Sequence, residues 1–135
     1  MDALVVRVVV ACVLGMHGAG HLLGWMPALG IARFEGTVGG SWLLTGVLGD
    51  GSSRAVAAGL FLVPTVGFVV AAAGLLLGQP WWRSAAVASA AISLAASALY
   101  PQALPVGSTV GSVAVNGLVL YGIVVAGWGS DLVGA

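Results

Sequence analysis

The sequence predicts an all-α integral membrane protein, a four-helix bundle with a short interfacial or re-entrant segment after the first helix. Apolar residues make up 60% of the 135-residue chain and charged residues only 6%, whereas a soluble domain carries about 25% charged residues. Four cations and four carboxylates are too few to cover a surface that faces water. The apolar residues also cluster into runs near the roughly 20 residues that a membrane-spanning helix needs.

Four apolar runs are predicted to cross the bilayer, and the first three end near a proline, where helices tend to stop. The predicted spans are residues 3–23, 54–78, 82–100 and 106–128. Pro64 lies inside the second run, where a membrane helix tolerates it and usually kinks. Since the number of spans is even, both chain ends are expected on the same side of the bilayer.

The segment 26–53 is predicted not to span, because it contains charged residues and many glycines. Within it, residues 41–48 are apolar but too short to cross, which favours a helix lying at the interface or re-entering from it. Two arginines lie on each side of this predicted topology, so the positive-inside rule gives no orientation. They are Arg7 and Arg83 on the side of the termini, and Arg33 and Arg54 on the other.

Small residues four positions apart predict close helix packing. The pairs are Gly67–Ala71, Gly74–Gly78, Ala86–Ala90 and Gly107–Gly111. Ser89, Ser93 and Ser97 form a polar stripe that is expected to join helices or line a polar cavity. Two aromatic belts are expected at the headgroups, with Trp25, Trp42 and Tyr100 on one side and Trp81, Trp82 and Trp128 on the other.

The chain has only two histidines, His17 and His21, and both fall in the first span. They are four residues apart and therefore share one helix face. At 1.5 Å per residue they lie about 5 and 10 Å beyond a span centre near Leu14. Ionisable groups at that depth usually face the bundle interior and mark functional sites. Neighbouring glycines would let a flat ligand approach, so this segment is the first candidate site.

Several uses of this pair remain open. Residues His17 and His21 could chelate zinc, copper or another divalent metal with help from Glu35 and Asp50, the carboxylates expected on the same side. Haem is a second option, although adjacent turns of one helix cannot supply both axial ligands of one haem. A third is a hydrogen bond to a quinone or similar headgroup, with Asn116 and Trp42 completing the ligand-binding set. Alternatively, the imidazoles simply bond to Asn116 or to the serine stripe between helices.

The first span resembles the opening helix of the DoxX-like membrane proteins. That family has an Arg near the start of the span and later a His-Gly pair, then two residues and a Lys. Residues Arg7, His17 and Gly18 match this pattern, and His21 stands where the Lys would be. The resemblance implies a small subunit or partner of a membrane redox system, with cytoplasmic termini and the histidine end facing outward.

The leading functional prediction is a small accessory protein of the bacterial cell membrane that binds a hydrophobic ligand or a redox partner near the histidines. No Walker loop, Rossmann fingerprint, nucleophile elbow or Cys-x-x-Cys occurs, which argues against an independent enzyme and leaves a subunit of a membrane oxidoreductase. The expected partners are lipid and other membrane subunits or further copies of the chain, without nucleic acid. A purely structural assembly subunit and an oligomeric transporter or channel are the alternatives.

Overall fold

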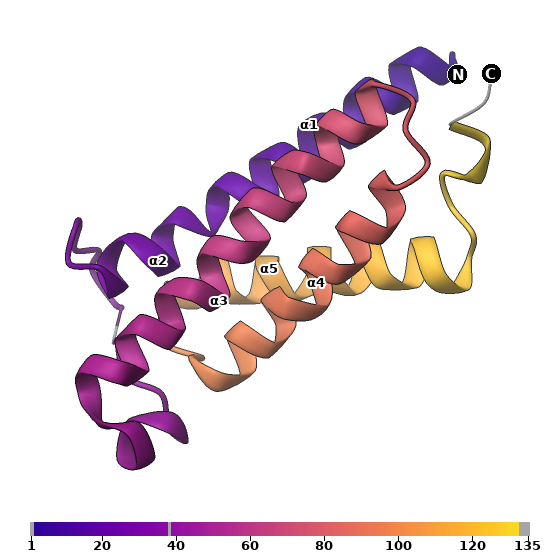
Figure 1. Ribbon diagram of the computed structural model, residues 1–135. Helices are drawn as coiled ribbons and strands as arrows, with labels where there is room; N and C mark the ends of the chain where they lie inside the picture. Colours follow the sequence, from indigo (N-terminus) through magenta and orange to yellow (C-terminus); the bar gives the residue numbers. More distant parts are fainter. Residues whose placement is uncertain (1, 38, 133–135) are drawn as a thin grey trace.

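The computed structural model describes residues 2–37 and 39–132, and the regular structure in them is entirely helical. Four stretches are long and apolar enough to cross a membrane. They are Ala3–Ala28 (α1, Ala3–Gly20, with α2, Leu22–Ala28), Leu44–Leu76 (α3), Trp82–Leu99 (α4) and Val106–Val125 (α5, Val106–Leu120, with a π-helical turn η1, Tyr121–Val125). Successive spans run in opposite directions, and both chain ends lie at the same end of the bundle (Figure 1). The predicted four-helix membrane bundle is confirmed.

The first span is longer than predicted, because α2 continues it to Ala28 instead of stopping at residue 23. The helix is terminated by Gly30, the second residue after Ala28, which has a φ of 73°. The Gly30 N–H donates to Pro27 O at 3.0 Å, and the Ile31 N–H donates to Met26 O at 2.9 Å. This pair of bonds is the Schellman motif, which requires a left-handed residue after the helix. Gly30 therefore terminates the first span, while Pro27 lies within the last turn of α2.

Helix α3 begins ten residues before the predicted start at residue 54, because it takes in part of the predicted interfacial segment. The backbone is non-helical only at Gly49, with φ 76° and ψ 165°, a conformation open essentially to glycine alone. Pro64 stays within helical geometry and is buried. The short first part of α3 is held by the residues before it, since Trp42 Nε1 donates to Ala98 O at 2.8 Å and Ser41 Oγ to Leu99 O at 2.7 Å.

The core lies where α3 packs between α1 and α4, and small residues set the distance between these helices. A Cβ added at Gly18 of α1 would lie 3.0 Å from both the Phe68 Cβ and the Thr65 carbonyl oxygen of α3. A Cβ at Gly67 would meet the Ser89 Oγ of α4 at 2.0 Å. All three alanines of the predicted packing pairs are fully buried: Ala71, Ala86 and Ala90. The predicted pair Gly107–Gly111 on α5 differs, because neither glycine has a neighbour within 4 Å of an added Cβ.

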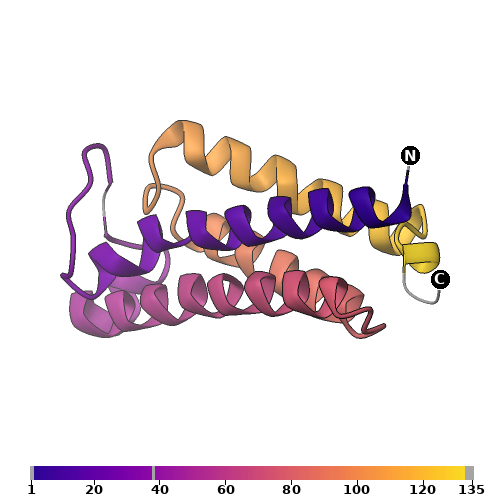
Figure 2. The same ribbon diagram turned by 90° about the horizontal axis from the view of Figure 1, so that it is seen from above.

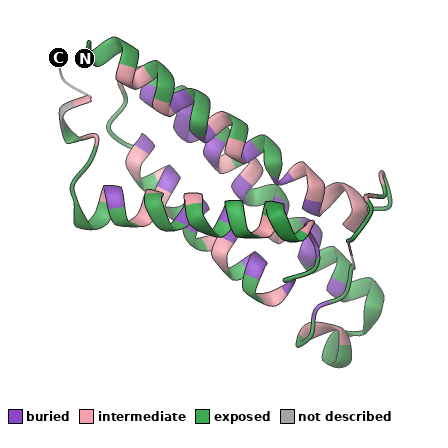
Figure 3. Ribbon diagram, turned by 180° about the vertical axis from the view of Figure 1, so that it is seen from behind, coloured by how far each residue is buried: buried purple, intermediate pink, exposed green. Residues whose placement is uncertain are grey.

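Burial is uneven around the bundle. In the first and fourth spans 17% of the most apolar window is buried, against 39% in the second and third. Figure 3 shows α5 exposed along most of its length. The outer surfaces of α1 and α5 therefore face lipid or another membrane protein.

Two of the predicted belt aromatics belong to the core. Tyr100 is 1% exposed and its hydroxyl donates to Ser53 O at 2.7 Å, while Trp82 is 2% exposed. Trp42, Trp81 and Trp128 are exposed as a headgroup belt requires. A sequence pattern places such residues near the ends of spans, but only packing decides whether the ring points inward.

Candidate functional site

Four polar side chains from three helices meet in the bundle interior. His17 Nε2 lies 2.9 Å from the Asn116 Oδ1 of α5, and Asn116 Nδ2 donates to the Ser93 Oγ of α4 at 2.7 Å. Ser93 Oγ in turn lies 2.6 Å from His21 Nε2, and His21 Nδ1 lies 2.9 Å from the His17 carbonyl oxygen. The hydrogen bonds therefore form a circuit that leaves the His17 side chain and returns to its backbone. We call these four residues the polar circuit.

The backbone carbonyl at the end of the polar circuit fixes the direction of every bond in it. A carbonyl oxygen only accepts, so His21 Nδ1 carries a hydrogen and donates it to His17 O. Neither histidine forms an ion pair within the described chain, and a bare cation at this depth is costly, so both rings are neutral. His21 Nε2 then accepts from the Ser93 hydroxyl, and Ser93 Oγ accepts from Asn116 Nδ2. Asn116 Oδ1 accepts from His17, which leaves the hydrogen on Nε2 of that ring.

The break between α1 and α2 makes the circuit possible. The His21 N–H donates to Gly18 O at 3.1 Å, a bond to the third residue back. In a regular α-helix it would donate to the fourth residue back, His17. The carbonyl of His17 is thus free to accept from the His21 ring. The His21 side chain thus takes the place of the backbone N–H that would bond the His17 carbonyl in a regular helix.

An aromatic ring of α3 packs against both imidazoles. The Phe68 ring centroid lies 4.8 Å from that of His17 and 5.9 Å from that of His21. Residues His21, Ser93 and Asn116 are 2%, 0% and 0% exposed, whereas His17 is half-buried. Three members of the polar circuit are thus almost fully buried, and His17 is the most exposed of the four.

His17 lines a cleft between α1 and α5, which diverge toward the start of α5 (Figure 2). The cleft has a volume of about 230 Å³. Its polar lining comes from His17, His21, Ser108 and Ser112, and its apolar lining includes Leu104 and Val115. A second hollow of about 230 Å³ follows the same pair of helices toward the termini and is lined only by apolar side chains. Because Val115 lines both, the two hollows adjoin.

Two of the polar residues in the cleft, Ser108 and Ser112, were missed by the sequence analysis. A signal for them exists in the chain, since Ser108, Ser112 and Asn116 follow one another at intervals of four and so share one face of α5. Ser112 is 8% exposed, and its oxygen accepts a second bond from Asn116 Nδ2 at 3.3 Å. The glycines of the same helix obscured this pattern.

The carboxylates proposed for a metal site do not join the histidines. Within residues 2–37 and 39–132, no three His, Cys, Asp or Glu residues are grouped as a metal ion would require. Glu35 is exposed in the loop after α2, and Asp50 lies near the start of α3. Both nitrogens of His21 are also engaged, by Ser93 and by the His17 carbonyl.

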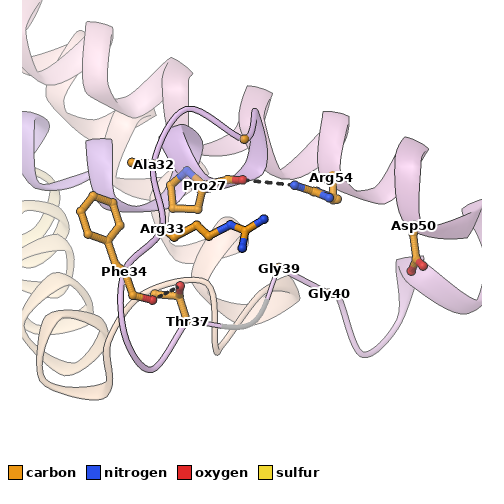
Figure 4. A pocket seen from close by; sticks show the side chains of 10 residues that line it. Pro27, Ala32, Arg33, Phe34, Thr37, Gly39, Gly40, Asp50 and Arg54 are labelled. Atoms are coloured by element: carbon orange, nitrogen blue, oxygen red, sulfur yellow. Dashed lines mark hydrogen bonds between the residues drawn. The ribbon is translucent and has the colours of Figure 1, made fainter.

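Asp50 instead lines a larger pocket of about 530 Å³ between the loop after α2 and the start of α3. Arg33 and Arg54 also line this pocket, and Figure 4 shows Arg33 on the loop, Arg54 on α3 and Asp50 further along α3. The Arg54 side chain donates to Pro27 O at 3.4 Å, at the carboxyl end of α2. This pocket lies outside the helical bundle and is separate from the polar circuit.

Trp42, the remaining predicted ligand-binding residue, is also separate from the histidines. Its ring is 71% exposed and its indole nitrogen is bonded to the end of α4. Of the residues predicted for a ligand site, the structure therefore brings together His17, His21 and Asn116, and leaves Trp42 apart.

The site belongs to a small membrane protein whose four spans carry a buried polar circuit and a lateral cleft. The resemblance of its first helix to the DoxX-like proteins stays a prediction. Comparison of the chain with protein-family models, with curated proteins and with solved structures finds no match.

Proposed function

We propose that the protein is an accessory subunit of a membrane complex and binds a lipid-soluble ligand in the cleft between α1 and α5. The observation that carries this proposal is the position of His17, which belongs to the polar circuit and also lines the cleft. A few polar groups held rigidly at the wall of a largely apolar hollow are the usual arrangement in ligand sites. The ligand would enter sideways from the bilayer, since the cleft opens on the lipid-facing side of the bundle.

The occupied nitrogens favour an organic ligand over haem or a metal ion. His21 has both ring nitrogens in hydrogen bonds, and His17 has its Nε2 bonded to Asn116. Among the described residues one ring nitrogen has no partner, Nδ1 of His17, which suits a single hydrogen bond from a donating headgroup such as that of a reduced quinone. A metal site needs more ligands than this.

The partner of this subunit is proposed from the exposed spans and from the family resemblance. The first and fourth spans are the least buried, so their outer faces are available to another membrane subunit or to a second copy. The DoxX-like pattern at Arg7, His17 and Gly18 suggests a redox complex of the bacterial cell membrane, with cytoplasmic termini. In that setting the ligand would be a lipid-soluble electron carrier that the catalytic partner also binds.

Filling the cleft tests this function. Val115→Trp places a large ring where the two hollows meet, and Val113→Trp places the same ring on an exposed position of the same helix. Both variants and the unchanged protein are purified in mild detergent, and bound lipids are extracted and identified by mass spectrometry. We expect one lipid species to be enriched in the unchanged protein and in Val113→Trp, and depleted at least tenfold in Val115→Trp. Equal lipid content in all three would remove the proposal.

The closed polar circuit supports a second function, that of a structural subunit whose histidines only hold helices together. In that case no specific lipid is enriched, and Val115→Trp leaves the host complex assembled and active. Under the first function, Val115→Trp lowers the activity of the host complex while assembly persists. Activity and assembly of the complex, measured side by side, separate the two.

A further inference from the structure

We infer that the headgroup bound in the cleft is a hydroxyl, as in an alcohol or a phenol, which both donates a hydrogen bond to His17 and accepts one from Ser112. This inference rests on the proposed function and specifies the chemistry of the ligand. It follows from the direction of the bonds in the polar circuit and from the groups that the circuit leaves unused.

The His17 ring offers the cleft an acceptor. Its Nε2 carries the hydrogen that goes to Asn116 Oδ1, so in the neutral ring Nδ1 has a lone pair and no hydrogen. Within the described chain, this Nδ1 has no hydrogen-bond partner. Because His17 lines the cleft, a ligand there meets a nitrogen that can only accept.

Ser112 offers the cleft a donor. Its oxygen accepts from Asn116 Nδ2 at 3.3 Å, and no acceptor for its own hydrogen is found among the residues described. Two other hydroxyls of the bundle bond back to their own helix, Ser89 to Ala85 O and Thr65 to Phe61 O. Ser112 lacks such a bond and is more than nine-tenths buried beside the cleft.

An acceptor and a donor in one small hollow match a group that donates and accepts at once. A ketone or ether oxygen would direct its lone pairs at the lone pair of Nδ1 and could accept only from the serine hydroxyls of the cleft, Ser108 and Ser112. An anionic head would need a cation, and no arginine lines this cleft. A hydroxyl satisfies both groups without a charge.

The volumes and linings of the two hollows indicate which kind of molecule carries the hydroxyl. The polar cleft holds about 230 Å³, less than the roughly 300–1,000 Å³ of ordinary ligand pockets. It therefore accommodates a headgroup and not a whole lipid. The adjoining hollow past Val115 is lined by valine, leucine, isoleucine and tryptophan side chains, which suits an alkyl or prenyl tail.

A matched pair of probes tests the inference. A 4-alkylphenol and its methyl ether have the same ring and tail, but only the phenol can donate. Binding of each is measured by native mass spectrometry of the purified protein, with Val115→Trp measured in parallel to subtract nonspecific partitioning. We expect the phenol to bind about tenfold more tightly than the ether, which is the effect of one neutral hydrogen bond.

His17→Gln separates the hydroxyl contact from the structural role of this residue. The glutamine amide nitrogen can replace Nε2 in the bond to Asn116, but the acceptor at Nδ1 is lost. We expect this variant to remain folded and to bind phenol and ether equally. Equal binding by the unchanged protein, or a phenol preference that survives in His17→Gln, would overturn the inference while leaving the cleft a lipid site. Binding of neither probe would overturn the proposed function as well.

Discussion

At the residue scale, the stability of this bundle depends on a few polar side chains that satisfy one another. Lipid offers no hydrogen bonds, so an amide or imidazole in the interior must find its partners within the protein. Ser93 joins α4 to the rest of the polar circuit, since it bonds both His21 and Asn116. The sequence indicated that the histidines could bond to Asn116 or to the serine stripe, but it could not distinguish Ser93 from its neighbours Ser89 and Ser97.

Ser93→Ala is expected to lower the free energy of unfolding by about 1–2 kcal/mol, the upper part of the range found for interhelical hydrogen bonds in membranes. The loss arises because His21 Nε2 and one hydrogen of Asn116 would be left unpaired in the interior. Unfolding in mixed micelles, followed by circular dichroism, measures it.

Ser97→Ala is the matched control, one turn further along the same buried stripe. The Ser97 hydroxyl is buried and, in the part of the chain described, has no hydrogen-bond partner. Its removal should be neutral or slightly stabilising. If the two alanine variants were equally stable, the polar circuit would contribute nothing to the fold.

At the element scale, the helices differ in how closely they can approach. Helix α1 lies against α3 because Gly18 leaves no side chain between them, which is the usual role of small residues in membrane interfaces. Helix α5 diverges from α1, and the glycines at positions 107 and 111 face open space. The predicted pair Gly67–Ala71, with the same spacing of four, lies instead in a tight interface, since an added Cβ at Gly67 would meet Ser89 of α4. Identical small-residue spacing thus occurs both in a tight interface and on an open wall, and the pattern alone could not distinguish the two.

Gly18→Leu is expected to destabilise the bundle by about 1–3 kcal/mol, the usual cost of overpacking. Its side chain would meet the Phe68 Cβ and the Thr65 carbonyl, and a backbone atom cannot move aside. Gly15→Leu is the control, because nothing lies within 4 Å of an added Cβ at that position. Thermal unfolding of both variants in the same detergent checks the difference, and similar midpoints would contradict the close approach.

At the scale of the whole molecule, one end of the bundle is closed by arginines that bind backbone carbonyls. Arg7 donates to Leu132 O, and Arg83 donates to Ile123 O at 3.0 Å within the π-helical turn η1. Such contacts satisfy carbonyls that irregular helix ends leave free. At the opposite end, Arg33 and Arg54 face the loop pocket. The chain ends and the loop between α3 and α4 share the first side, and the loops after α2 and α4 share the second (Figure 1).

Single cysteines in a Cys12→Ala background test this topology. We expect Gln79→Cys, in the exposed loop between α3 and α4, to react with a membrane-impermeant maleimide from one face of sealed vesicles. Glu35→Cys and Gln102→Cys should react only from the other face, because an odd number of spans separates each from residue 79. Labelling of all three from the same face would contradict the four-span arrangement.

The sequence by itself determined that this is a helical membrane protein with four spans. Its long apolar runs leave too little charge for a water-facing surface, and a span in lipid must satisfy its own backbone, which makes it helical. Helix ends were less well determined, because Gly30 and Gly49 terminate or break helices through positive φ angles that follow from local backbone bonding.

Only the tertiary structure decided which polar residues meet and where the bundle is open. His17 and Asn116 are 99 positions apart in the chain, so their contact depends on how α1 and α5 lean against α3 and α4. The same packing moved Tyr100 and Trp82 into the core, kept Trp42 and the carboxylates away from the histidines, and left the cleft beside His17. The spacing of residues in the sequence shows which side chains share a helix face. Which helix packs against that face depends on the arrangement of the whole bundle.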